Sequence, residues 1–331
     1  MTRIPHPLVV RGGVLPVLIP VLLVLLSALI PRLLGATAES DLEFVHSLME
    51  STRSLTLAER IEKTSERLLG KPYELGGLGE GPGALYDQDP LYRFDSFDCT
   101  TFVETVIALS RADDFPGFER EMNRVRYVNG KIGFTTRNHF TSLDWIPNNA
   151  TTGILRDVTV EVAGEKNWMD AVARIDPGSW YKMMKESDLN VRALDKATLD
   201  ERLLQLRNEA KNFEAHTVHL PYIPVPMVLG PSGKEILDRI PDGAMINIVR
   251  PGWDLTEVAG TQLNISHQGL AIRVDGILNF RHASSAGSKM VTQQPLDEYL
   301  SRFRDHATIK GINVLQVLEP LRAPGVSNPA H

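Results

Sequence analysis

Residues 94–105, FDSFDCTTFVET, contain the only cysteine of this 331-residue chain and begin the segment around which its fold is predicted. Apolar side chains follow at positions 102, 103, 106, 107 and 109, near the 3.6-residue period of an amphipathic helix. Asp98 is a good N-cap, because its side-chain oxygen can accept from N–H groups of the first turn. The sequence therefore predicts a helix from Cys99 to about Arg111, with Cys99 at its first position.

That position bears on the chemistry of the thiol. A single cysteine cannot form a disulfide within the chain, so it is either a buried small residue or a reactive group. Free N–H groups and the helix dipole favour a thiolate, and we expect them to lower the pKa of Cys99. The charge of Asp98 acts partly against this effect. A base close to the sulfur would favour the reactive interpretation.

The stretch 265–285, ISHQGLAIRVDGILNFRHASS, predicts a β-hairpin that supplies such a base. Asp275-Gly276 is a strong signal for a two-residue turn. With that turn His282 lies diagonal to His267 on one face of the sheet, within reach of a hydrogen bond. Small residues at 269 and 271 on this face would let a helix pack closely. A thiol, an imidazole base and a second imidazole that orients the base would form a nucleophilic triad. The alternative is two unrelated polar positions on a solvent face.

Three blocks of the sequence resemble the NlpC-type cell-wall peptidase domain. Residues 73–104 carry its tyrosine, its glycine pair and its Asp-Cys helix start. IPDGAMINIVRP, residues 240–251, resembles the strand before the family's histidine, and residues 267–285 resemble the histidine strand and the third polar residue. Residues 126–150, RYVNGKIGFTTRNHFTSLDWIPNNA, resemble one branch, the N-acetylmuramoyl-L-alanine amidase-like proteins of domain of unknown function 1460. The resemblance covers about 65–320.

The resemblance implies a papain-like α+β fold, in which a catalytic helix packs on a small antiparallel sheet with additional helices. It implies that Cys99 is the nucleophile, His267 the general base and His282 the orienting residue. The hydroxyl of Tyr73 lines the family's site, and Asp98 is assigned with it to the oxyanion and substrate-binding region. No cofactor is expected.

Other polar residues are candidates for substrate contacts. Arg137, Asn138 and His139 could bind the carboxylate and polar groups of a muropeptide, or could form a polar loop edge. His216 and His219 have a spacing that binds metals on helices. The neighbouring prolines predict an extended chain there, and no third ligand has the expected spacing, so no metal site is predicted.

The branch implies hydrolysis of the bond between N-acetylmuramic acid and L-alanine in soluble muropeptides, including anhydro-muropeptides. The first alternative is the bond between γ-D-glutamate and the diamino acid of the stem peptide. Acyl transfer to an amine through the same thioester is a further possibility. A non-catalytic module that binds the cell wall is the alternative from a different class.

The N-terminal residues indicate export. Residues 1–38 hold three arginines, no acidic residue, an apolar run and a small-x-small exit at Ala38, which is typical of a secretory signal peptide. The alternative is an uncleaved anchor in the inner membrane, which would be the only membrane contact. The remaining chain holds 32 basic and 41 acidic residues, a net charge of −9, which argues against nucleic acid as a partner. We therefore expect a periplasmic protein whose partners are peptidoglycan fragments.

The rest of the chain is predicted coarsely. Residues 39–70 form an N-terminal helical segment, and 71–320 form the catalytic domain with a helical insertion around 150–235. Helices are expected over 166–185 and 196–214, a hairpin around Asn129-Gly130, and a short strand followed by a helix over 286–303. The tail, 321–331, is expected to be loose.

Overall fold

A computed structural model describes residues 30–192 and 194–320 of the chain. The chain divides into two compact units, residues 1–44 and residues 45–331. The described residues of the first unit all lie in helix α2 (Ile30–Thr52), which continues into the second unit. Residues 1–29 of the predicted signal peptide and the predicted loose tail lie outside the described residues. Within the described part of the chain, no helix is long and apolar enough to cross a membrane.

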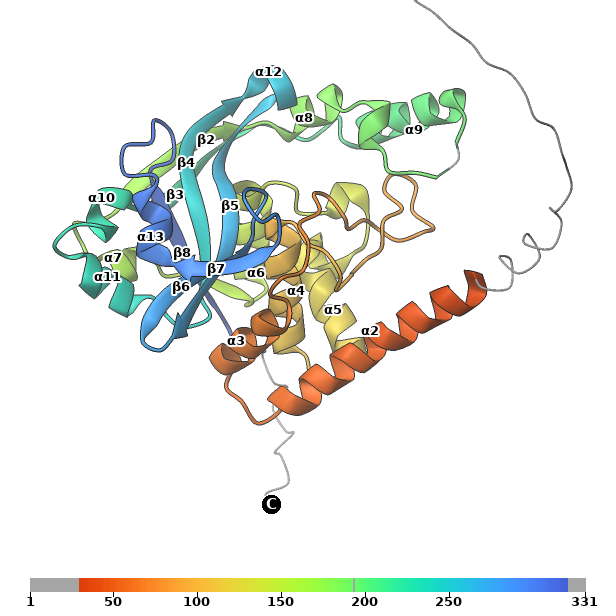
Figure 1. Cartoon of the computed structure of the whole chain (residues 1–331). Helices are drawn as coiled ribbons and strands as arrows, with labels where there is room; N and C mark the ends of the chain where they lie inside the picture. Colours follow the sequence, from red (N-terminus) through yellow and green to blue (C-terminus); the bar gives the residue numbers. More distant parts are fainter. Residues whose placement is uncertain (1–29, 193, 321–331) are drawn as a thin grey trace, which may run out of the picture. The chain divides into compact units, whose positions relative to one another are not determined.

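The second unit is built on one antiparallel sheet of eight strands (Figure 1). Seven strands follow the order β2-β3-β8-β4-β5-β6-β7, and β1 pairs with β8 beside this path. Their bounds are β1 Leu155–Asp157, β2 Met169–Ile175, β3 His216–Pro224, β4 Met245–Leu255, β5 Thr261–Val274, β6 Ile277–Ala283, β7 Val291–Pro295 and β8 Gly311–Val317. Helices and an antiparallel sheet together confirm the predicted α+β class.

Short helices bury one face of the sheet. Side chains from four of them form a single apolar cluster with strands β3, β4, β5, β6 and β8. Figure 1 shows these helices gathered on one side of the unit. They are α7 (Thr159–Ala163), α10 (Val225–Val228), α11 (Gly233–Arg239) and α13 (Leu296–Ser301).

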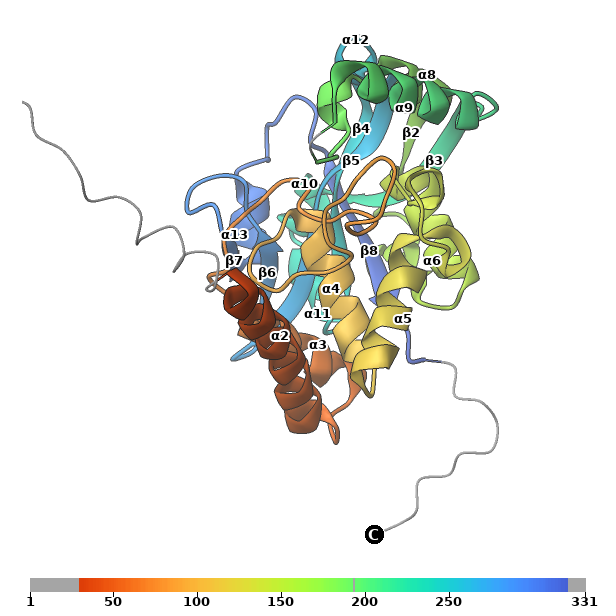
Figure 2. The same cartoon turned by 90° about the vertical axis from the view of Figure 1, so that its right-hand side faces the viewer.

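Helix α4 (Cys99–Arg111) packs against β5 and β6 and between its neighbours in the chain. Figure 2 shows α4 in front of the sheet, next to α5 (Phe115–Arg126) and α3 (Leu57–Arg67). Every residue of α4 from Thr101 to Arg111 is buried. The predicted helix and its bounds are therefore confirmed. Because the helix is buried along most of its length, its N-terminus is held in a fixed position.

The middle of the chain contributes helices α6 (Ile146–Thr151), α8 (Pro177–Met183) and α9 (Lys196–Glu209). Figures 1 and 2 both place α8 and α9 at one end of the sheet, together with α12 (Thr256–Ala259). The predicted helix beginning at residue 196 is confirmed, but it ends at Glu209.

The prediction of a helix over 166–185 was wrong for its first half. Residues 169–175 form strand β2, which pairs with β3, and only Pro177–Met183 is helical. Ala171, Ala173 and Ile175 are buried and alternate with exposed residues, which is the two-residue period of a strand. The insertion around 150–235 thus contains three strands of the sheet as well as helices.

The predicted hairpin around Asn129-Gly130 was also wrong. Both residues have positive φ, 55° and 68°, as a tight hairpin turn requires. However, α5 runs to Arg126 and a 3-10 turn, η1, covers Val128–Gly130, so no residues remain for a first strand. One isolated bridge, from Tyr127 to Arg137, is the pairing that the structure describes across this turn.

Other local predictions were confirmed. The helical segment over 39–70 consists of α2 and α3, separated where Thr56 and Glu59 form a capping box at the start of α3. The strand and helix expected over 286–303 are β7 and α13. Residues 216–224 are extended, as their prolines predicted.

Candidate active site

The first turn of α4 holds the thiol in place. Asp98 is the N-cap, and its Oδ1 accepts from the N–H of Thr101 at 2.8 Å. In return the N–H of Asp98 donates to Oγ1 of Thr101 at 2.9 Å, which completes a capping box. Oδ2 of Asp98 accepts from the N–H of Gly76 at 3.0 Å. Cys99 is therefore at the first helical position, and the carboxylate that was assigned to substrate binding instead caps the helix and anchors the glycine-rich loop.

The hairpin of β5 and β6 joins the two histidines. Val274 pairs with Ile277 and Leu270 with Arg281, which is the predicted register. Nε2 of His267 lies 2.7 Å from Nδ1 of His282. The predicted contact between the imidazoles is thus present, and the alternative of two unrelated polar positions is excluded.

We had expected Gly269, which lies between the histidines, to make room for a helix. It makes room for an aromatic ring instead. A Cβ atom on Gly269 would lie 2.5 Å from Cε2 of Phe280. The ring of Phe280 stacks on His282 with centroids 4.6 Å apart, and Tyr299 meets the same imidazole edge-on at 5.3 Å. His282 is 3% exposed, so these rings fix its orientation.

Gln268 connects the thiol to the histidine strand. Oγ1 of Thr100, the residue after Cys99, donates to Oε1 of Gln268 at 2.6 Å, and the main chain of Gln268 favours the thiolate form of Cys99. Nε2 of Gln268 in turn donates to Oδ1 of Asn247 on β4 at 3.1 Å. Sequence reasoning missed this residue. Gln268 lies on the same strand face as Leu270 and Ile272, which we had predicted to be apolar. A glutamine on such a face was the sign that it has a polar partner.

The thiol is less acidic than we had expected. Burial raises the pKa of Cys99 to about 11, and the carboxylate of Asp98 raises it further, against hydrogen bonds from Gln268 and Thr100. Part of the residue reaches the surface, but protein surrounds most of the sulfur. The prediction of a lowered pKa was therefore wrong, because burial and Asp98 outweigh the helix N-terminus.

Both imidazoles are neutral at physiological pH. Burial lowers the pKa of His267 to about 4, although the charge of Asp98 opposes this shift. Burial, followed by the charges of His267 and Arg302, lowers the pKa of His282 to about 3. In the free protein the thiol and both rings are therefore neutral.

Tyr73 lies near the same sulfur. Its segment forms a parallel bridge with Phe97, two residues before Cys99, and its N–H donates to the carbonyl of Lys289. Burial raises the pKa of Tyr73 to about 12, and the charges of Cys99 and Asp98 add to the rise. The hydroxyl therefore keeps its proton and can donate a hydrogen bond.

The three residues expected to contact substrate are used inside the protein. The guanidinium of Arg137 forms ion pairs with Glu80 and Asp87. Asn138 is 8% exposed, donates to the carbonyl of Val125 and accepts from Asn148. We therefore correct the prediction for Asn138, which lies in the interior.

His139 is likewise a structural residue. Its Nε2 bonds to the carbonyl of Phe134 at 2.8 Å, and its ring lies 4.8 Å from the rings of Phe134 and Trp180. Burial lowers the pKa of His139 to about 3, so the ring is neutral. Arg137 and His139 form part of the wall of a cavity.

That wall belongs to a cavity of about 650 Å³, which neither Cys99 nor His267 lines and which adjoins the start of α4 only through Gly76. Gly76, which bonds to Asp98, lines one side together with the exposed Leu75. Trp180 and Met183 from α8 and Val258 from α12 line another. The volume is that of a small-molecule site. Across the described residues, no group of three side chains is arranged to hold a metal ion.

Three comparisons place this geometry among known proteins. A model of the N-acetylmuramoyl-L-alanine amidase-like family matches residues 63–309. The match covers most of the chain, from α3 past α13. The chain belongs to the N-acetylmuramoyl-L-alanine amidase-like family. It is therefore an enzyme, and the alternative of a non-catalytic wall-binding module is set aside.

Solved structures agree with the family. A Legionella pneumophila protein of domain of unknown function 1460 is 38% identical, with a TM-score of 0.81, over 86% of this chain and 96% of that one. An N-acetylmuramoyl-L-alanine amidase from Bacteroides uniformis is 25% identical, with a TM-score of 0.56, over 80% and 99%. A Bacteroides fragilis protein provisionally named a xylanase is 28% identical, with a TM-score of 0.53, over 77% and 99%. Comparison with curated proteins gave no match.

The names of these relatives imply two different reactions, hydrolysis of an amide bond and hydrolysis of a glycosidic bond. The residues around Cys99 favour the first. Hydrolysis of a glycosidic bond commonly uses two carboxyl groups on either side of the bond. The carboxylate next to Cys99 is Asp98, and both of its oxygens are occupied by main-chain N–H groups. A thiol and two imidazoles suit acyl chemistry instead.

Proposed function

We propose that this enzyme is a papain-like, NlpC-type cysteine amidase of peptidoglycan fragments, with Cys99 as nucleophile, His267 as general base and His282 as orienting residue. The observation that carries the proposal is the 2.7 Å contact between the two imidazoles. The strand that carries His267 is joined to the start of α4, because Oγ1 of Thr100, the residue after the only cysteine, donates to Oε1 of Gln268 at 2.6 Å. An oriented base beside a sulfur is the arrangement that nucleophilic amide cleavage requires.

The contact between the rings limits where their protons can lie. His267 uses Nε2 toward His282, which leaves Nδ1 for the thiol. To accept a proton at Nδ1, His267 must carry hydrogen on Nε2 and donate it to Nδ1 of His282. His282 then carries its hydrogen on Nε2, an atom that is buried without a hydrogen-bond partner among the described residues. This tautomer is inferred from the required direction of proton transfer.

The reaction follows from these positions. In the free enzyme the sulfur lies 4.0 Å from Oγ1 of Thr100, and proton transfer requires it to come within hydrogen-bond reach of Nδ1 of His267. The thiol proton passes to Nδ1 of His267 as the sulfur attacks the amide carbonyl and the C–S bond forms. His267 then protonates the leaving amine as the C–N bond breaks. Water, deprotonated by His267, hydrolyses the thioester and restores the thiol.

The developing oxyanion needs donors that the protein does not already use. The N–H of Cys99 is in the first helical turn, where no intrahelical acceptor exists. The protonated hydroxyl of Tyr73 is the second candidate. Loss of one such donor typically reduces kcat by about 10²–10³-fold.

The cavity beside α4 supports a substrate that is larger than a simple amide. Trp180 offers a partly exposed ring for a sugar, and Leu75 and Val258 are exposed apolar residues at its edge. Family membership favours the bond between the lactyl group of N-acetylmuramic acid and L-alanine. The proposed substrate is therefore a soluble muropeptide.

A direct test is mass spectrometry of a disaccharide-tetrapeptide incubated with the protein and with Cys99→Ala. The proposal predicts release of the intact tetrapeptide by the wild-type protein alone. Release of a shorter peptide would keep the thiol mechanism and move the cut to the γ-D-glutamyl bond. Equal release by Cys99→Ala would overturn the proposal.

We also propose that residues 1–38 direct export to the periplasm, because their composition is that of a signal peptide. Fractionation of cells that express the full chain tests this. A processed protein in the periplasmic fraction is the expected result. A full-length protein in the membrane fraction would indicate an uncleaved anchor.

A further inference from the structure

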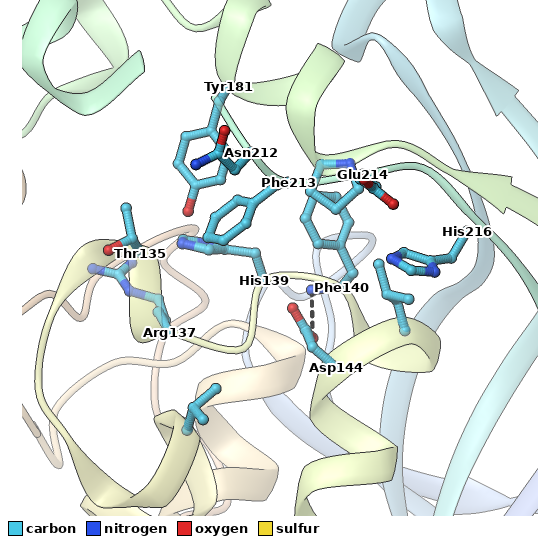
Figure 3. A pocket seen from close by; sticks show the side chains of 13 residues that line it. Thr135, Arg137, His139, Phe140, Asp144, Tyr181, Asn212, Phe213, Glu214 and His216 are labelled. Atoms are coloured by element: carbon cyan, nitrogen blue, oxygen red, sulfur yellow. Dashed lines mark hydrogen bonds between the residues drawn. The ribbon is translucent and has the colours of Figure 1, made fainter. Parts of the chain in front are cut away.

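A second cavity, of about 410 Å³, lies apart from the thiol and is lined mainly by aromatic and apolar side chains (Figure 3). It shares only Arg137 and His139 with the cavity beside α4. Its aromatic lining consists of His139, Phe140, Tyr181, Phe213 and His216. A cavity of this size and lining is typical of a small-molecule site. The mechanism above uses none of its lining residues chemically.

One carboxylate is aimed into this cavity. Oδ1 of Asp144 accepts from the N–H of Phe140 at 2.8 Å, and Figure 3 shows the other oxygen directed at the space between the rings. Glu214 adds a second carboxylate at the exposed side, near His216 (Figure 3). A carboxylate in an apolar setting is costly unless it is paired.

The positive groups in the lining do not neutralise this carboxylate. Arg137 directs its guanidinium to Glu80 and Asp87, with 2.8 Å between Nη2 and Oδ2 of Asp87. His139 is neutral, because burial lowers its pKa to about 3. The charge of the cavity is therefore set by the carboxylates.

The opening of the cavity is aromatic and uncovered. Phe213 is 39% exposed, and its ring lies 5.5 Å from that of Tyr181, which is buried. An organic cation is attracted to the face of such rings as well as to a carboxylate. A ligand that combines an apolar body with a positive head would cover Phe213 and pair with Asp144.

We propose that this cavity binds a small organic ammonium ion, with its apolar body between Phe140, Tyr181 and Phe213 and its charged head on Asp144. A neutral ligand of the same shape would leave the charge of the carboxylate without a counter-ion, since only main-chain N–H groups bond to it. An anion would be repelled. The proposal does not depend on the identity of the bond that Cys99 attacks.

Acidity gives the site a characteristic pH dependence. Burial raises the pKa of Asp144 to about 7, against hydrogen bonds from main-chain N–H groups. The other titratable groups facing it are Arg137, His139, Tyr181, Glu214 and His216. A cation favours the ionised form of Asp144, so its affinity falls as pH drops below about 7. Between pH 8 and pH 6 we expect about a tenfold loss.

The test is calorimetric titration of the full chain with benzylammonium chloride at pH 8, with benzyl alcohol as the neutral ligand of the same shape. We expect saturable binding of benzylammonium at one site, and binding of benzyl alcohol at least about tenfold weaker. Equal affinity for the two ligands, or no saturable binding of benzylammonium, would overturn the proposal.

Variants locate the site. Asp144→Asn keeps an oxygen for the N–H of Phe140 and removes the charge, so affinity should fall about 10–100-fold. Phe213→Ala changes an exposed residue and should also weaken binding. Glu165→Gln, which changes an exposed carboxylate outside the cavity, is the matched control. Unchanged affinity in both Asp144→Asn and Phe213→Ala would place the bound cation elsewhere and overturn the assignment.

Phe213→Ala changes only the opening of the cavity. It therefore remains informative if Asp144→Asn fails to fold.

Discussion

The position of one proton determines how Cys99 can react. Burial raises the pKa of Cys99 to about 11 and lowers that of His267 to about 4, so at neutral pH the proton stays on sulfur. A preformed ion pair of thiolate and imidazolium is therefore not the resting state. Proton transfer must accompany attack on the substrate.

Alkylation of the free enzyme tests this protonation state. Because thiolate is the reactive form, the rate with iodoacetamide should rise about tenfold per pH unit from pH 6 to pH 9. Cys99→Ala removes the only cysteine and should show no labelling. A rate that is independent of pH between 5 and 8 would show an ion pair and contradict this account.

His282 is the other residue whose role depends on a single atom. His282→Ala removes the acceptor 2.7 Å from Nε2 of His267 and should lower kcat by about 10²-fold or more. His282→Asn offers an amide oxygen to the same N–H and should retain more activity. The measurement is kcat on a muropeptide, with circular dichroism to confirm folding. Equal activity of His282→Ala and wild type would exclude the orienting role.

At the level of elements, the site depends on the junction of α4 with β5. The bond from Thr100 to Gln268 holds the helix start against the strand that carries His267. Gln268 is 1% exposed and Asn247 is fully buried, so the bond between them is shielded from water, whereas Thr100 is partly exposed. A buried network of this kind fixes register only while every member is satisfied.

A double-mutant cycle on this junction should show strong coupling. Gln268→Leu leaves the Thr100 hydroxyl without its acceptor and should lower the free energy of unfolding by about 1–3 kcal/mol. Thr100→Val together with Gln268→Leu should recover part of that loss, because both partners are then apolar. Urea unfolding of the four proteins measures the coupling. Strictly additive effects would show that the bond does not join the elements.

Elements with strong local signals were predictable from the sequence. The cap and apolar period of α4, and the Asp275-Gly276 turn of the β5–β6 hairpin, each lie within a short stretch. Strand β2 was missed because its alternation, seen at Ala171, Ala173 and Ile175, was read as part of a longer helix. The turn at Asn129-Gly130 was identified, but the packing of α5 prevents a strand before it.

At the scale of the whole molecule, the walls of the site come from distant segments that no local pattern reveals. Glu80 and Asp87 form ion pairs with Arg137, about fifty residues further along the chain. Arg137, which we had predicted to contact substrate, is therefore used in an ion pair within the protein. The contact between the two histidines could be predicted from the sequence because both lie in one hairpin. Their proximity to Cys99 came only from family resemblance, since it depends on how α4 packs on the sheet.

One buried ion pair ties several of these segments together. Glu104 on α4 accepts from Arg126 on α5 at 2.6 Å and from Nε1 of Trp145 at 2.9 Å. Arg126 also donates to the carbonyl of Leu78 in the glycine-rich loop at 2.8 Å. The pair therefore links the catalytic helix to the loop that borders the cavity.

Removal of one partner should destabilise the whole unit. Glu104→Ala leaves a buried guanidinium and should lower the free energy of unfolding by about 3–5 kcal/mol. Glu186→Gln, which breaks the exposed pair with Lys196, is the control and should leave stability unchanged. Urea unfolding compares the two. Equal stability of Glu104→Ala and wild type would contradict a linking role for the pair.

The central claim is that Cys99 carries the acyl group during amide cleavage. Rapid acid quenching during turnover of a disaccharide-tetrapeptide, followed by intact-protein mass spectrometry, tests it most directly. The account predicts a transient adduct on the wild-type protein, with the mass of the disaccharide-lactyl acyl group, and neither adduct nor product with Cys99→Ala. An adduct that also contains L-Ala-D-Glu would retain the nucleophile and change the bond. Turnover by Cys99→Ala at the wild-type rate would contradict the account.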